Sequence, residues 1–223
     1  MELGKVLPEQ VADRIRTGII DRRFLPGERL TESALVKWLN ISNSPIREAL
    51  NLLEKEGLVV KEPRRGAYVR RFTEEDIRQL YLVRSALDDV AYKLLIEDKA
   101  LEDGLPDRLA REIELHEAAA AAGDHAACVE HDLRFHDLIF EAVGTDVLIS
   151  VWTILRAQFR VLLHWRKWGI APHSGYAGFP PMHHAILNAL RQRDLATLMA
   201  HSERRSEENT QELSRVLRET ISG

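Results

Sequence analysis

The stretch TESALVKWLNISNSPIREAL, residues Thr31 to Leu50, decides the fold of the N-terminal part of the chain. It holds two short helical patterns with a turn at Asn40, because Asn tolerates the left-handed backbone that ends a helix better than most residues. Thr31 can cap the first helix, and Pro45 falls in the first turn of the second, where a missing N–H removes no helical bond. A second helix with polar side chains facing outward is the arrangement that enters the major groove of DNA.

Signals on both sides extend this motif. An apolar helical stripe covers residues 8–22, and the Pro-Gly pair in FLPGERL forces a turn before Thr31. Ser42 or Ser44 can cap the second helix, and Gly57 ends it. Two short apolar runs then flank EPRRG, which predicts a β-hairpin, or wing, with basic residues at its tip.

Length and composition limit the classes of protein to consider. The 223 residues, 45% of them hydrophobic, suffice for one large or two modest domains, and we expect no membrane span. The N-terminus lacks a signal-peptide pattern, so we expect a cytoplasmic protein. The single Cys128 excludes an internal disulfide and a cysteine-rich zinc module. Residues 1–71 carry more Lys and Arg than Asp and Glu, whereas the remainder is acidic, which suggests a polyanionic partner for the first part only.

After Phe72 the sequence reads as helices throughout. TEED at residues 73–76 resembles a capping box that begins a long helix. The apolar stripe expected to be buried in that helix is Leu80, Val83, Leu87, Val90 and Leu94. Further helical patterns continue to about residue 219, among them one at 146–168 that precedes an open Gly/Pro segment at 169–181. We therefore expect a mainly α fold, with a winged helix-turn-helix DNA-binding domain at 1–71 and an all-α bundle at 72–223.

One pair of residues stands out among the histidines and carboxylates. Asp132 and His136 are four residues apart, so both can point into the bundle from one helix face and share a divalent ion. A buried Asp–His hydrogen bond without metal has the same sequence pattern. We expect surface or loop positions for the histidines to which spacing assigns no partner, namely His116, His125, His131 and His173.

Four separated motifs resemble the DNA-binding domain of GntR-type transcription regulators. They are the PGERL turn, the SPIREAL recognition helix, the LLEKEGLV junction and the RRGAYV wing, in the same order and spacing. The resemblance implies that Arg47 contacts DNA from the recognition helix and that Arg65 and Gly66 at the wing tip approach the minor groove. The polar helix face of Arg47 agrees with this, and a surface arginine paired with Glu48 is the alternative.

This chain departs from the family pattern at two positions. Asn43 and Ser33 stand where arginine is usual or frequent, so an operator sequence cannot be transferred from relatives. Fewer cations also predict a shallower dependence of DNA affinity on salt. The DNA-contacting candidates are Thr31, Ser33, Asn43, Ser44, Arg47, Arg65 and Gly66.

The segments YLVRSALDD, DLRFHDLIF and HHAILNALRQRD resemble the FCD effector domain of the FadR subfamily. The resemblance implies that an Asp, a His four residues later and two histidines from the last helices hold a divalent metal, which binds a small organic acid. Asp132, His136 and His183 match the first three ligands. His184 falls where the family more often has Arg, and it is a competing ligand.

The fourth metal ligand is less well defined. The family histidine is expected one helical turn beyond His201, where this chain has Arg205. We predict His201 as the ligand, because one turn shifts a residue along the helix axis more than around it. The alternatives are a site with three protein ligands or one in which Arg205 binds the anion. Ligands of N and O type suit Zn²⁺, Ni²⁺ or Mn²⁺.

Four basic residues are candidates for an anion pocket that binds the effector. Arg84 matches an arginine of the family. Arg156, Arg160 and His164 rest only on their i, i+4, i+8 spacing along one helix, and a solvated basic stripe is the alternative.

We therefore expect a homodimeric transcription regulator, a repressor, that binds a double-stranded DNA operator under the control of a small organic acid at a divalent metal. A metal-free regulator of a bulkier ligand such as an acyl-CoA is the first alternative. A DNA-docked metalloenzyme is the second, and it ranks low because the sequence shows no general base or nucleophile motif. We do not expect an enzyme.

Overall fold

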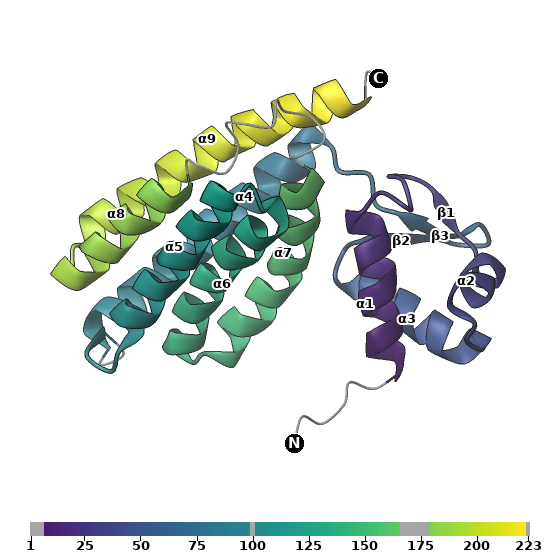
Figure 1. The fold of residues 1–223 in the computed structure, drawn as a ribbon, viewed down its shortest axis with the longest axis horizontal. Coiled ribbons are helices and arrows are strands. Elements are labelled where there is room, and N and C mark those ends of the chain that lie inside the picture. Colours follow the sequence, from purple (N-terminus) through teal and green to yellow (C-terminus); the bar gives the residue numbers. More distant parts are fainter. Residues whose placement is uncertain (1–6, 99–100, 166–178, 222–223) are drawn as a thin grey trace. The chain divides into compact units, whose positions relative to one another are not determined.

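The computed structural model describes residues 7–98, 101–165 and 179–221 (Figure 1). The chain forms two compact units. One holds Met1–Phe72 and Ala157–Val161, and the other holds Thr73–Arg156 and Leu162–Gly223.

Three helices and a small sheet build the described part of Met1–Phe72. The helices are α1 (Leu7–Ile20), α2 (Glu32–Leu39) and α3 (Asn43–Lys55). The antiparallel sheet has the order β1 (Arg29–Leu30), β3 (Gly66–Val69), β2 (Val59–Glu62). The β2–β3 hairpin is the predicted wing. The sequence did not predict β1, because two residues are too few to show the alternation of a strand.

Thr31 and Asn40 mark the two ends of α2, and Ser42 marks the start of α3. The Thr31 hydroxyl accepts a hydrogen bond from the Ala34 backbone N–H at 3.3 Å, and Asn40 has a φ of 54°, so both predicted helix ends of α2 are confirmed. Ser42 takes the N-cap position of α3 without a side-chain hydrogen bond, and Ser44 bonds Glu48 at 3.1 Å instead. The predicted N-cap position of Ser42 is therefore confirmed, although its side chain makes no capping hydrogen bond.

The core of this unit lies between α1 and α3, which pack against each other. Its fully buried side chains include Ile15, Ile19, Ile46 and Leu53. These residues recur at helical spacing, so each helix presents one apolar face to the other and leaves the outer face of α3 polar.

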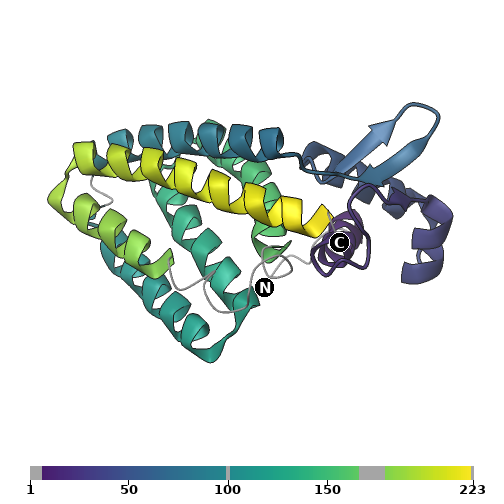
Figure 2. The ribbon, with the colours of Figure 1, turned by 90° about the horizontal axis from the view of Figure 1, so that it is seen from above.

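Helices α4 to α9, apart from residues 157–161 of α7, build the described part of the second unit. They are α4 (Glu74–Glu97), α5 (Leu105–Ala122), α6 (His125–Val143), α7 (Asp146–Trp165), α8 (Phe179–Gln192) and α9 (Leu195–Ile221). Helix α4 runs along α9, and α5 packs against α6 and α8 (Figure 2). The predicted fold class, a winged helix-turn-helix followed by an all-α bundle, is confirmed.

Helix α4 begins as predicted but buries a different face. Thr73 and Asp76 form a reciprocal capping box, with the Asp76 N–H donating to Thr73 Oγ1 at 3.1 Å. The predicted buried stripe is wrong, since Val83, Val90 and Leu94 are 44%, 43% and 45% exposed. The buried residues are Ile77, Tyr81, Arg84, Asp88, Ala91, Tyr92 and Leu95. This buried face contains the charged residues Arg84 and Asp88, so in the sequence it resembles a face exposed to solvent.

Helix α7 corrects the expectation that no segment could span a membrane. Asp146–Trp165 is long and apolar enough to do so by length and composition. Half of the most apolar 18-residue stretch of this helix is buried inside the protein. The core helix of a soluble protein can have the same length and composition. The sequence reading underestimated this helix because Arg156 and Arg160 interrupt its apolar residues. Its predicted end at residue 168 lies outside the described residues.

Candidate functional site

Four of the seven predicted DNA-contacting residues border a groove between the helix-turn-helix and the hairpin. The groove has a volume of about 810 Å³. Its charged lining residues are Arg29, Glu32, Arg47, Lys61, Glu62 and Arg64. Of the predicted residues, the lining includes Thr31, Ser33, Arg47 and Gly66, but not Asn43, Ser44 or Arg65. Cations outnumber carboxylates in the lining, which suits a polyanion.

Arg47 is held at the surface by an ion pair. Its Nε donates to both carboxylate oxygens of Glu32, at 2.9 and 2.7 Å. The partner is thus Glu32 of α2 and not Glu48, which the sequence suggested as the alternative. The Arg47 side chain is 67% exposed, and ion pairs at such sites contribute roughly 0–1 kcal/mol. The guanidinium can therefore exchange Glu32 for DNA at small cost.

The wing tip combines an exposed cation with an unusual backbone. Gly66 has a φ of 108°, which side chains other than glycine's rarely allow, and an added Cβ would lie 3.3 Å from Arg29 Nε. Arg65 pairs with Glu62 at 2.8 Å, and its side chain is 74% exposed. Backbone and cation are therefore both accessible at the tip.

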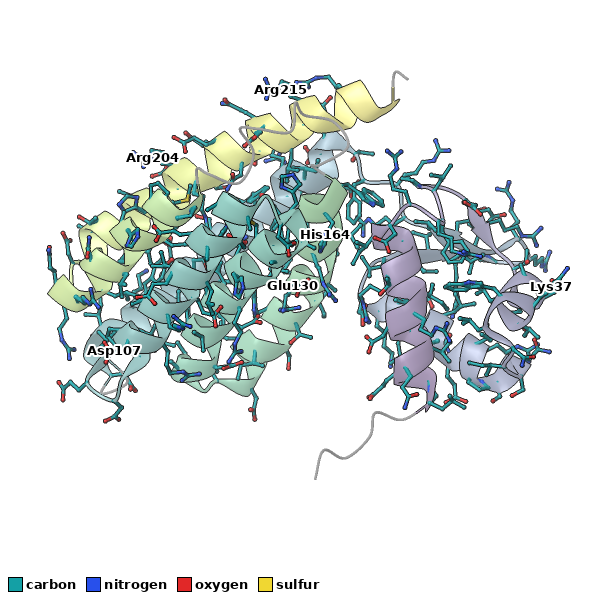
Figure 3. All side chains as sticks on the ribbon, in the orientation of Figure 1. Lys37, Asp107, Glu130, His164, Arg204 and Arg215 are labelled. Atoms are coloured by element: carbon teal, nitrogen blue, oxygen red, sulfur yellow. The ribbon has the colours of Figure 1, made fainter. Side chains whose placement is uncertain are left out.

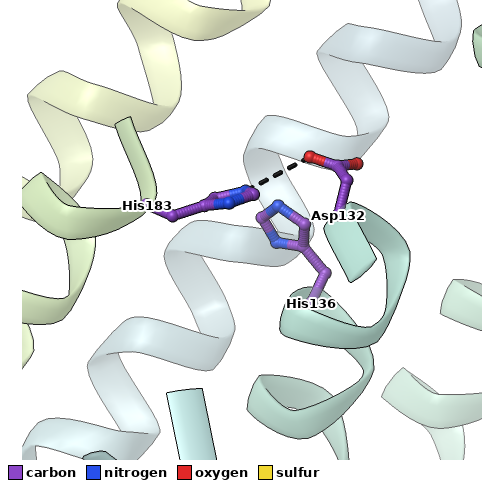
Figure 4. A group of neighbouring side chains, drawn as sticks. All are labelled: Asp132, His136 and His183. Atoms are coloured by element: carbon purple, nitrogen blue, oxygen red, sulfur yellow. Dashed lines mark ion pairs between the residues drawn. The ribbon is translucent and has the colours of Figure 1, made fainter. Parts of the chain in front are cut away.

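Three predicted metal ligands meet inside the second unit (Figure 4). Asp132 and His136 come from adjacent turns of α6 and His183 comes from α8, and one ligand atom from each lies within 4.8 Å of the others. All three side chains are buried, and His183 Nε2 lies 3.2 Å from Asp132 Oδ1. One carboxylate and two imidazoles form a donor set of the kind that binds divalent metals.

Arg205, and not His201, reaches this cluster from α9. Its Nη1 donates to His136 Nε2 at 2.8 Å, and its Nη2 donates to Asp88 Oδ2 at 2.5 Å. His201 is half-buried one turn earlier and is absent from the metal-ligand group that the described residues form. The structure therefore does not bring the predicted fourth ligand to the other three.

The electrostatics of the cluster explain these contacts. Burial, together with repulsion from Arg84 and Arg205, lowers the pKa of His136 well below its usual value, so its ring is neutral and Nε2 can accept a hydrogen bond. Burial opposes the charge of Asp132, but the hydrogen bond with His183 and the attraction of nearby cations lower the pKa of this carboxyl. Burial also opposes the charge of Arg205, but the attraction of Asp88 raises its pKa.

Asp88 on α4 is a member of the site that the sequence reading missed. It is fully buried, bonds Arg205, and lies 3.7 Å from the Nε of Arg84. The signal was its position four residues after Arg84, which places an acid and a base on one helix face.

The prediction that His116 lies at the surface is wrong. The residue is fully buried on α5, and its ring centroid lies 5.8 Å from that of His183. Burial lowers its pKa to about 4. Its spacing from the buried Leu109 and Ile113 was the available signal. The other histidines expected at the surface are His125 and His131, which are half-buried, and His173, which lies outside the described residues.

The predicted effector-binding residues fall in two places. Arg84 is 3% exposed beside Asp88, and its guanidinium carbon lies 5.4 Å from the centroid of Trp152. The ring of Trp152 lies 6.0 Å from that of His136, so Arg84 belongs to the same buried region as the three donors.

Two of the three α7 candidates, Arg156 and His164, face carboxylates of α6 instead. Arg156 Nε donates to Asp137 Oδ1 at 2.8 Å, and His164 Nε2 lies 3.5 Å from Glu130 Oε1. Figure 3 labels both members of the second pair. Arg160 is half-buried on the same helix. These side chains are therefore neither a solvated stripe nor part of the three-donor group.

His184, the competing metal ligand, lies away from the cluster. Its Nε2 is 3.0 Å from Glu117 Oε1, and its side chain is 51% exposed. Adjacent residues on a helix point about 100° apart, so α8 can direct only one of its two neighbouring histidines inward.

Family profiles and relatives match both units. The profile of bacterial regulatory proteins of the gntR family matches residues 7–69, and the FCD domain profile matches residues 79–219. A Bacillus subtilis protein named as an HTH-type transcriptional regulator, YdhC, is 34% identical over 59% of this chain and 58% of its own length.

Two further comparisons cover more of the chain. The gluconate operon transcriptional repressor of Bacillus licheniformis is 26% identical over 83% of this chain and 76% of its own. The fold is similar to that of McbR/YncC of E. coli, with a TM-score of 0.77, 21% identity, and coverage of 93% of this chain and 97% of the other. With an FCD match over most of its length behind a gntR-type helix-turn-helix, the chain belongs to the GntR family of bacterial regulators and is a DNA-binding transcription regulator rather than an enzyme.

Proposed function

We propose that this regulator is a repressor that leaves its operator when a small organic acid binds in the helical domain. The observation that carries the proposal is the buried cluster of Asp132, His136, His183 and Arg205. Charged groups are costly to bury, and such clusters concentrate at functional sites. The gluconate operon repressor among the relatives supports the direction of control.

Two arrangements would present a cation to the acid. A divalent ion, Zn²⁺, Ni²⁺ or Mn²⁺, on Asp132, His136 and His183 would supply an open coordination position for a carboxylate. The guanidinium groups of Arg84 and Arg205 would do so without metal. The contact between Arg205 and His136 favours the second arrangement.

A homodimer is the second part of the proposal. The exposed apolar residues Val83, Val90 and Leu94 of α4 are spaced by seven and four residues, as in the seam of a coiled coil. Pairing two chains would set two recognition helices about one DNA turn apart on a two-fold operator. We also propose a division of roles between residues 1–71, which bind DNA, and 72–223, which bind effector and partner, in the cytoplasm.

The test is fluorescence anisotropy of the purified protein on its own promoter DNA, with a panel of small organic acids that includes gluconate. We expect at least one acid to release the DNA, and Arg84→Met to abolish release while preserving DNA affinity. Arg204→Met is the matched control, because Arg204 is an exposed arginine of the same unit. Identical binding with and without every acid would refute the control by an effector.

A further inference from the structure

A guanidinium donates to a ring nitrogen of His136, one of the three donors of the cluster. We propose that Arg205 is the resident cation of this site and that it excludes divalent metal ions from Asp132, His136 and His183. The proposal deepens the proposed effector site and rests on it for its biological meaning, but metal exclusion can be measured without DNA or effector.

The first argument concerns the lone pair of His136. A neutral imidazole has one nitrogen that can accept a hydrogen bond or bind a metal, and it cannot do both at once. That nitrogen is Nε2, which accepts from Arg205 at 2.8 Å. The other nitrogen, Nδ1, therefore carries the proton, and it lies 4.0 Å from Asp88 Oδ1, which is beyond hydrogen-bond distance. A metal on His136 would have to displace the guanidinium.

The second argument is that Arg205 is fixed in place. Its Nη2 bonds Asp88 at 2.5 Å while Nη1 bonds His136, and its side chain is only 6% exposed. The planar fork of the guanidinium holds both partners at once. Displacing it would break both contacts and leave a buried cation without its carboxylate.

The third argument is the balance of charge. Two buried guanidinium groups, Arg84 and Arg205, face two buried carboxylates, Asp88 and Asp132. The cluster is therefore neutral as it stands. A divalent ion would add two uncompensated positive charges close to two fixed cations, in a region where burial makes such repulsion strong.

The remaining donors also need no metal. His183 Nε2 lies 3.2 Å from Asp132 Oδ1, a distance at which its N–H donates to the carboxylate. Phe135 stacks on the His183 ring at 4.1 Å between centroids and holds the ring in this orientation. Two of the three donors, Asp132 and His183, are thus paired with each other, and the third, His136, is paired with Arg205.

The experiment compares metal binding by wild type, Arg205→His and Arg204→His. Metal content is measured by mass spectrometry, and Zn²⁺ affinity is measured by competition with a chromophoric chelator. Arg205→His replaces the guanidinium with a fourth neutral donor, so we expect it to bind one Zn²⁺ at least about 100-fold more tightly than wild type. Arg204→His puts a histidine on the outer face of α9, where the labelled Arg204 lies (Figure 3), and should bind Zn²⁺ as wild type does.

Each outcome either supports or overturns the exclusion of metal by Arg205. A gain in Arg205→His that disappears when Asp132→Ala is added supports the proposal. One equivalent of metal in wild type, lost in Asp132→Ala, overturns it, and so does an Arg205→His variant that folds and gains no affinity. If circular dichroism shows that Arg205→His does not fold, wild type decides alone, since tight one-to-one Zn²⁺ overturns the proposal and its absence supports it. An effector that fails to release DNA bears on the proposed function and leaves this result unchanged.

Discussion

Arg205 also has a structural role that can be separated from its place at the site. It is the closer of two cations facing the fully buried Asp88, at 2.5 Å against 3.7 Å for Arg84. Removing one member of a buried ion pair costs about 3–5 kcal/mol, because the other charge stays buried. We therefore expect Arg205→Met to lower the free energy of unfolding by about that amount in urea titrations.

Arg204→Met is the control for this loss. Its side chain is 63% exposed and pairs with Glu208 at 3.6 Å, so the change should stay within about 0.5 kcal/mol. Equal losses in the two variants would show that Asp88 does not depend on Arg205.

We expect Glu32 to limit the affinity of α3 for DNA. Its carboxylate forms an ion pair with Arg47 at the groove, and the negative charge of the carboxylate would repel DNA phosphate. Because an exposed pair is worth roughly 0–1 kcal/mol, we expect Glu32→Gln to tighten DNA binding by up to about 5-fold at low salt. Anisotropy titrations with promoter DNA would measure this.

Glu48→Gln is the matched control, since it removes a carboxylate from α3 that bonds Ser44 and not Arg47. In an Arg47→Ala background the Glu32→Gln gain should shrink. A gain that is the same with and without Arg47 would mean that Glu32 acts only through its charge.

At the scale of the element, the start of α4 depends on one hydroxyl. Thr73 accepts from the Asp76 N–H, and Asp76 accepts from the Thr73 N–H at 2.8 Å. Losing such a cap costs about 1 kcal/mol, so Thr73→Ala should lower the free energy of unfolding by about that amount in urea titrations. Thr73→Ser keeps the oxygen and should restore most of the loss. If serine is as destabilising as alanine, the cap is not the cause.

The outer face of α4 leads to a prediction about assembly. Val90 is 43% exposed between Val83 and Leu94, and a charge there would oppose burial in a dimer. We expect Val90→Asp to shift the protein toward monomer in analytical ultracentrifugation. Val60→Asp, at a 46% exposed position of β2, should leave the assembly unchanged. A monomeric wild type would contradict the homodimer itself.

Helix patterns predicted where the helices lie, but they did not predict which face of α4 is buried. Asn40 and Thr73 act through local backbone chemistry, which nearby residues determine, and both were predicted. The buried face of α4 depends on Arg84 and Asp88, whose burial requires Arg205 from more than a hundred residues away. Local periodicity carries no information about such a partner.

At the scale of the whole molecule, the sequence predicted only those members of the candidate site that share one helix or match the family pattern. Asp132 and His136 share a helix, and the family pattern added His183. The choice between His201 and Arg205 depends on how far α9 advances along α4 when the two helices pack, which the sequence of α9 does not state. The same packing brings Asp88 to Arg205 and so sets the chemistry of the site.

The strand β1 has a mechanical consequence for the regulator. It joins the segment that leads into α2 to the wing, with Arg29 opposite Tyr68 and Leu30 opposite Ala67. The wing therefore cannot hinge away from the helix-turn-helix without breaking backbone hydrogen bonds, and the two predicted DNA-contacting elements move as one rigid body. In a dimer, effector binding would then change the distance and angle between the two DNA-binding domains, because the shape of each domain is fixed.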